Sequence, residues 1–177
     1  MKKKSERSID FTKIDWKSID DERLQFYFNQ AVEANDSILT SINNINDKTN
    51  QFLAIASALL AALTGFLLDV WEKPEKTATV NAMLCGCIGL GLIIVALLIA
   101  LFPRTVYPGK ATPDIMFSGN LYKEPMIKHF ADGIASYHQY ILLNRKVAKF
   151  RRCFLLIGMG GFLLVPLTTI ALLLWVF

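Results

Sequence analysis

Three long apolar runs constrain this chain more than any other feature of its sequence. Residues 52–68 contain neither a charged residue nor a proline, and residues 80–102 and 153–177 form longer runs. A helix rises about 1.5 Å per residue and a hydrocarbon core is about 30 Å thick, so the first run is just long enough to cross a bilayer. Hydrophobic residues make up 53% of the 177 residues, and their excess lies in these runs. The sequence therefore predicts a membrane protein with three transmembrane helices.

The distribution of charge predicts which side of the membrane each segment faces. Residues 103–152 contain 9 Lys/Arg and only 3 Asp/Glu, and Arg104 follows the second run directly. Five basic residues lie just before the third run: Arg145, Lys146, Lys149, Arg151 and Arg152. Basic residues near membrane ends favour the cytoplasmic side. We therefore expect residues 1–51 and 103–152 in the cytoplasm, with residues 69–79 and the C-terminus outside. No apolar segment follows residues 1–4, so we expect no signal peptide.

The region before the first run carries a heptad pattern. Ser18 and Asp20 are residue types that cap helices, so a helix should begin near Asp20. Neither proline nor glycine occurs in residues 20–64, which predicts one continuous helix about 70 Å long. Alternating steps of four and three residues connect Leu24, Phe28, Ala31, Asn35, Ile38, Ile42, Ile45, Thr49 and Phe52. This spacing indicates a packing seam. Asn35 either fixes register and partner number within the seam or reaches water.

A second heptad-patterned helix is predicted to begin near Glu124 and to run into the third apolar run. Its seam comprises Ile127, Phe130, Ile134, Tyr137, Ile141, Asn144 and Ala148. A lone chain would leave much of both seams exposed, so we expect a homo-oligomer. Residues 107–125 combine prolines and glycines with apolar side chains, which favours an irregular loop docked on the helices or the lipid surface.

These features predict an all-α membrane protein whose two long cytoplasmic helices form a heptad-patterned bundle. The expected organisation is a flexible tail (1–19), a cytoplasmic helix (20–51), a transmembrane hairpin (52–102, with spans 52–68 and 80–102), a cytoplasmic loop and helix (103–152) and a third span (153–177).

All three spans contain small residues, which allow membrane helices to approach closely. The candidates for packing or gating are Ser57, Ala61, Gly65, Gly86, Gly89, Gly158, Gly160, Gly161 and Pro166. Proline is tolerated in a membrane helix where threonines and neighbouring helices satisfy the carbonyls that it frees, and Thr168 and Thr169 follow Pro166. The sequence leaves open whether the third span gates a pore or only packs.

No residue pattern points to catalysis, a metal or a cofactor. His129 and His138 are nine residues apart, so they do not share a helix face as paired metal ligands would. No ionisable residue lies in the middle of a span, which argues against a proton relay or an ion-coupled transporter. The basic residues at 145–152 either contact anionic lipid, bind a nucleotide or nucleic acid, or only set the topology. We expect no specific binding of nucleic acid.

Three local segments carry a resemblance to a known family: residues 45–49 (INDKT), 114–122 (DIMFSGNLY) and 144–146 (NRK). Over about residues 24–177 the chain resembles SLATT and Pycsar-type transmembrane effectors of bacterial antiphage defence. The resemblance implies a non-enzymatic effector of the inner membrane that damages the bilayer when triggered, which leads to growth arrest or cell death. Its trigger would be a nucleotide second messenger or a cytoplasmic sensor protein. The alternative is a membrane anchor or sensor subunit that recruits a cytoplasmic defence partner.

Overall fold

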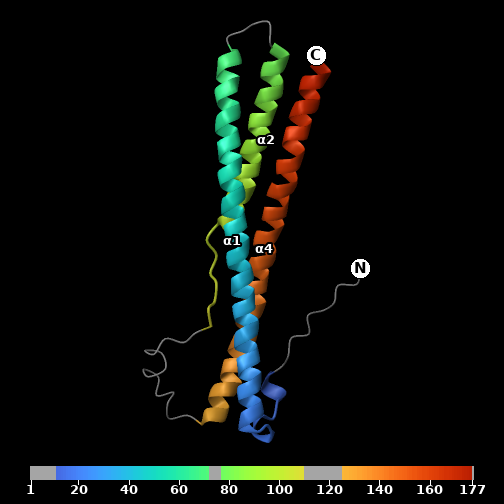
Figure 1. Ribbon diagram of the computed structural model, residues 1–177. Helices are drawn as coiled ribbons and strands as arrows, with labels where there is room; N and C mark the ends of the chain where they lie inside the picture. The colour runs from blue at the N-terminus through green and yellow to red at the C-terminus, as the bar shows by residue number, and fades with distance from the viewer. Residues whose placement is uncertain (1–10, 72–76, 110–124, 177) are drawn as a thin grey trace. The chain divides into compact units, whose positions relative to one another are not determined.

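Three helices dominate the computed structural model (Figure 1), which describes residues 11–71, 77–109 and 125–176. Helices α1 (Asp21–Trp71) and α4 (Met126–Val176) each contain 51 residues, and α2 (Thr77–Leu101) contains 25. Two short 3-10 helices, η1 (Phe11–Lys13) and η2 (Trp16–Ser18), precede α1. The described residues include no β-strand. The predicted all-α fold class is confirmed, and each predicted cytoplasmic helix continues without a break through its apolar run.

Helix α1 begins where its capping residues predict. The Asp20 carboxylate oxygen Oδ1 accepts a hydrogen bond of 2.8 Å from the backbone N–H of Arg23, which satisfies one of the free donors of the first turn. Helix α4 begins just after Pro125, whose carbonyl accepts hydrogen bonds from the N–H groups of Lys128 and His129.

The chain divides into two compact units. Unit 1 consists of Met1–Ile38 and Tyr107–Asn144, and unit 2 consists of Leu39–Val106 and Arg145–Phe177. The N-terminal parts of α1 and α4 therefore belong to unit 1. Their C-terminal parts belong to unit 2 together with α2.

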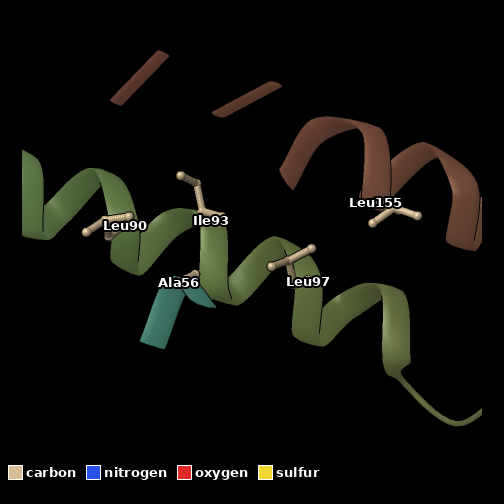
Figure 2. Close-up of a cluster of buried hydrophobic side chains, with 5 residues drawn as sticks. All are labelled: Ala56, Leu90, Ile93, Leu97 and Leu155. Carbon is tan, nitrogen blue, oxygen red and sulfur yellow. The ribbon is translucent and has the colours of Figure 1, made fainter. Parts of the chain in front are cut away.

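Unit 2 has an apolar core to which all three helices contribute. The buried side chains are Ala56 from α1, Leu90, Ile93 and Leu97 from α2, and Leu155 from α4 (Figure 2). Outside this core, most of the apolar surface is not covered by the chain itself. In the most apolar stretch of each helix, only 6% of residues in α1, 28% in α2 and 17% in α4 are buried.

This uncovered apolar surface requires an apolar environment. Side chains such as Phe66, Leu92 and Leu163 are more than 60% exposed, and burial of a large apolar side chain is worth about 1.5–3 kcal/mol. All three helices are long and apolar enough to span a membrane. The prediction of a multi-pass membrane protein is therefore confirmed.

Unit 1 is held together by aromatic side chains from α1 and α4. The Phe28 ring lies 5.6 Å, centroid to centroid, from both Phe130 and Tyr137. Gly133 makes room for it, because a Cβ atom at that position would lie 2.6 Å from Phe28 Cε2. Leu24, one heptad step before Phe28, is fully buried.

The heptad seams are covered within one chain. Leu24, Asn35, Ile42 and Thr49 are at most 2% exposed, and Phe28, Ile38, Ile45 and Phe52 are half-buried. In the second seam, Tyr137 and Asn144 are buried, and Ile127, Phe130, Ile134 and Ile141 are half-buried. The seams therefore do not by themselves require a second copy, contrary to the argument made from the sequence.

The segment before α1 differs from the flexible tail expected there. Within residues 11–19, the Phe11 ring stacks on Trp16 with centroids 6.2 Å apart, and its edge meets His138 of α4 at 5.2 Å. Ser18 Oγ donates a hydrogen bond to the Asp15 carbonyl. Residues 11–19 therefore pack on α4 within unit 1.

Candidate functional site

A cluster of buried hydrogen bonds is the most specific feature of unit 1. It comprises Asn35 of α1, Asn144 of α4 and the backbone of Tyr107 and Pro108, and we call it the asparagine cluster. Asn144 Nδ2 donates to Asn35 Oδ1 and to the Tyr107 carbonyl, both at 2.9 Å. Asn144 Oδ1 accepts the Tyr107 N–H at 3.0 Å. Asn35 Nδ2 donates to the carbonyls of Tyr107 and Pro108 at 3.3 and 3.2 Å.

This geometry ties an extended segment to two helices at once. Asn144 accepts from the N–H and donates to the carbonyl of Tyr107, so it bonds both backbone groups of this residue. Asn35 and Asn144 are both 0% exposed, and a buried polar group left without a partner costs about 1–3 kcal/mol. Asn35 therefore does not reach water, and the cluster fixes the position of residues 107–108 in unit 1.

Aromatic rings cover the asparagine cluster. The Tyr107 ring stacks on Tyr140 at 5.5 Å with an interplanar angle of 4°, and Tyr137 meets Tyr140 edge-on at 6.1 Å. Gly109 adopts φ 75°, a left-handed conformation that favours glycine, and a Cβ atom there would collide with the Tyr137 ring. Burial raises the pKa of Tyr137, and Asp36 and Tyr140 raise it further.

A cavity of about 380 Å³ lies elsewhere in unit 1, where residues 11–19 meet α1 and α4. Its lining is mainly apolar and includes Phe11, Trp16, Tyr27 and Ile134, together with His138. His138 Nε2 is buried and has no hydrogen-bond partner among the described residues. The cavity is large enough for a small molecule.

In unit 2, four of the predicted small residues lie against a neighbouring helix. A Cβ atom at Gly89 would lie 2.7 Å from Val165 Cγ2, and one at Gly86 would lie 2.9 Å from Leu63 Cδ2. On α4, the corresponding distances are 2.6 Å from Gly158 to Leu97 Cδ2 and 2.9 Å from Gly161 to Ile93 Cγ1. Each glycine receives a branched side chain from another helix, which is the packing that small residues permit in membranes.

Ser57, Ala61, Gly65 and Gly160 have no such neighbour among the residues that the structure describes. Ser57 and Ala61 are exposed on α1, and a Cβ atom at Gly65 or Gly160 would meet nothing within 4 Å. The row Ser57, Ala61 and Gly65 is thus an open face of α1 in one copy.

Helix α4 continues past Pro166 as one element. The hydroxyls of Thr168 and Thr169 both donate to the Val165 carbonyl, at 2.9 and 2.8 Å. Pro166 lacks the N–H that would bond the Phe162 carbonyl four residues earlier. Both threonine hydroxyls therefore bond the Val165 carbonyl rather than the Phe162 carbonyl.

The five predicted basic residues are not equivalent. Arg145, Lys146, Lys149 and Arg152 are exposed, whereas Arg151 is only 6% exposed. Arg151 Nη1 donates to Asn46 Oδ1 of α1 at 2.7 Å. Burial lowers the pKa of the Arg151 guanidinium, and the charge of Arg104 lowers it further.

Sequence reasoning missed several residues of these sites. It named Tyr107 and Pro108 only as part of the loop at 107–125 and Asn46 only as part of segment 45–49, and it did not pair Asn144 with Asn35. The available signal was that Asn144 and Asn35 are both polar residues within apolar seams. The partners of Tyr107 were not visible, because they are separated from it by 37 and 72 residues.

Comparison with known proteins identifies the family. Residues 30–176 match the family described as the Pycsar effector protein domain. Neither the curated proteins nor the solved structures include a detectable match. The match covers the first heptad seam from Ala31 onwards, the whole second seam, the asparagine cluster and the three apolar runs up to residue 176. The chain therefore belongs to the Pycsar effector protein domain family, as its resemblance to Pycsar-type antiphage effectors predicts.

Proposed function

We propose that this chain is a membrane effector of bacterial antiphage defence that perturbs the integrity of the inner membrane when triggered. Growth arrest or death of the infected cell would follow. The observation that carries the proposal is the family match over residues 30–176, which includes the three helices able to span a bilayer. The open apolar surface of these helices supports a role within the membrane itself.

The proposed orientation places the N-terminus in the cytoplasm and the C-terminus outside. The excess of Lys and Arg in residues 103–152 supports it. In this orientation unit 1, with its asparagine cluster and aromatic cavity, faces the cytoplasm. A nucleotide second messenger or a sensor protein would reach it there, and α1 and α4 connect it covalently to the spans.

We further propose that several copies associate to perturb the membrane. The support is the open row Ser57, Ala61 and Gly65, which leaves small residues available for close helix contact. Cross-linking of the single-cysteine variant Ala61→Cys, with Cys85, Cys87 and Cys153 replaced by serine, should give covalent dimers in membranes. Cysteine at Phe66 in the same background is the matched control. Equal cross-linking at both positions would contradict association through this row.

Replacement of a span separates the effector from a membrane anchor. The experiment uses phage-challenged cells that carry the chain with its neighbouring genes. In these cells the third span, residues 153–177, is replaced by an unrelated apolar helix of equal length. An effector should lose both depolarisation and protection, because its spans perform the activity. An anchor should keep protection, because it needs only attachment. Retained protection with a foreign span would therefore exclude the proposed function, provided that membrane fractions contain equal amounts of both proteins.

A further inference from the structure

Arg151 is a buried cation without a counter-ion among the described residues. It is 6% exposed, and its single described hydrogen bond runs from Nη1 to the neutral amide of Asn46. Its Nε is buried and has no partner in the described part of the chain. No carboxylate of the described residues lies within 4 Å of it. A buried charge is normally paired, because desolvation without an anion is strongly unfavourable.

A second guanidinium adds to this positive charge. Arg104 follows the end of α2, and its Cζ lies 3.5 Å above the centre of the Phe150 ring. Phe150 directly precedes Arg151 in α4, so the cation–π contact holds Arg104 on the same turn of α4 as the buried arginine. The two like charges repel each other, and the effect of Arg104 on the pKa of Arg151 reflects this repulsion. No contact among the described residues explains why the two guanidinium groups are kept together.

The surroundings indicate the kind of anion that would bind. Both arginines belong to unit 2, where α2 ends and where α4 reaches its third apolar run. Phe102, two residues before Arg104, is 65% exposed. A ligand bound at this position would thus place a negatively charged group beside the two arginines. The apolar chains of the same ligand would lie along the helices. Guanidinium groups suit phosphate oxygens because their planar donors bind two oxygens at once.

We propose that Arg104 and Arg151 form a binding site for the phosphate of an anionic phospholipid, with Asn46 positioning Arg151. The exposed cations Arg145, Lys146, Lys149 and Arg152 attract anionic lipids only diffusely. The site requires that the chain is a membrane protein and does not depend on the proposed damage to the membrane.

The test uses the full chain purified in a neutral detergent. Native mass spectrometry follows the binding of phosphatidylglycerol, with phosphatidylcholine as the zwitterionic reference. Arg151→Gln and Arg104→Gln should each weaken phosphatidylglycerol binding about tenfold, the effect of losing a charge-assisted hydrogen bond. Arg152→Gln is the matched control, because it removes the same charge from the next residue. It should change binding less than about twofold, as expected for an exposed cation.

Three results would overturn the proposal. Equal weakening by Arg152→Gln and Arg151→Gln would show that only the total charge matters. Equal binding of phosphatidylcholine and phosphatidylglycerol would show that acyl chains alone are recognised. Inorganic phosphate that raises the melting temperature as much as phosphatidylglycerol would assign the site to a soluble anion. Arg104 is exposed, so Arg104→Gln should keep the fold, which circular dichroism checks. This variant therefore tests the site even if Arg151→Gln is unstable.

Discussion

Asn35 and Thr49 occupy equivalent positions of one heptad seam, yet they use their polar atoms in opposite ways. Both are fully buried. Asn35, in unit 1, bonds to residues far away in the sequence, whereas Thr49, in unit 2, donates to the Ile45 carbonyl of its own helix at 2.7 Å. Hydrogen bonds are directional, so those of Asn35 specify one arrangement of α1, α4 and residues 107–108 within unit 1. Thr49 specifies none, and apart from the hydrogen bond between Arg151 and Asn46, unit 2 depends mainly on side chains that fit against glycines.

This difference indicates how the two units would respond to a trigger. Packing of branched side chains against glycines has no directional bond to break, so helices in unit 2 can re-pack at a smaller cost than helices in unit 1. We therefore expect unit 1 to keep its structure while the membrane spans rearrange. Substitutions that remove directional bonds should have the largest effects, and those that change only shape should have intermediate effects.

The largest effect is expected from Asn144→Ala. This change leaves the Tyr107 N–H and the Asn35 Oδ1 without their described partners, and it should lower the free energy of unfolding by about 3 kcal/mol. Chemical unfolding in detergent measures the loss, and hydrogen exchange should show it in unit 1. The exposed Asn44→Ala is the control and should stay within about 0.5 kcal/mol. Similar losses for both variants would contradict the role of the asparagine cluster.

A smaller effect is expected from Gly89→Ala, because its new methyl group meets Val165. Overpacking of this kind costs about 1–3 kcal/mol. Gly91→Ala provides a control two residues away on the same helix, where a Cβ atom meets nothing within 4 Å. It should be neutral or slightly stabilising, because alanine favours helix. Thermal unfolding in detergent compares the two, and equal melting temperatures would show that the packing of α2 on α4 does not limit stability.

Gly109→Ala tests the segment that the asparagine cluster holds. A left-handed conformation costs an alanine about 1–2 kcal/mol, and the methyl group also meets the Tyr137 ring. Chemical unfolding should show this loss, and hydrogen exchange should accelerate at residues 105–109. Gly160→Ala, which has open space around it, controls for the loss of glycine. Unchanged exchange at residues 105–109 would argue that the segment is not held by its backbone conformation.

Tyr137 makes the stability of unit 1 depend on alkaline pH. Its pKa is raised in the folded state, so the folded protein retains the proton more strongly than the unfolded chain. Its contribution is therefore fully present below the unfolded pKa of about 10 and is lost as the pH rises through the folded pKa. Tyr137→Phe should make the decline in the free energy of unfolding between pH 9 and 11 less steep. An identical slope in both proteins would exclude this contribution.

The smallest effect is expected from Thr49→Val. The hydroxyl bonds only to a carbonyl of the same helix, so its loss should change the free energy of unfolding by less than about 1 kcal/mol. Asn35→Ala, at the equivalent seam position of unit 1, should cost clearly more in the same unfolding assay. If the two substitutions had equal effects, the distinction between the units would be lost.

The sequence predicted the parts of this fold that depend on local patterns. The steps from Leu24 to Phe52 predicted the buried face of α1, and the capping residue Asp20 predicted its start to within one residue. The contacts of Asn35 could not be predicted in this way, since its partners lie 72 to 109 residues away. The row of Ser57, Ala61 and Gly65 showed where close packing is permitted, but only the tertiary structure shows that this face of α1 is open.

The order of events in single infected cells tests the central claim most directly. A membrane-potential dye and a growth marker are followed together after phage infection, in cells with the intact chain and in cells that lack it. Cells with the chain should lose their membrane potential before growth stops and before phage lysis. The opposite order would contradict the proposed membrane damage. In that case, a population that contains the chain survives infection, but its cells keep their membrane potential until growth has stopped.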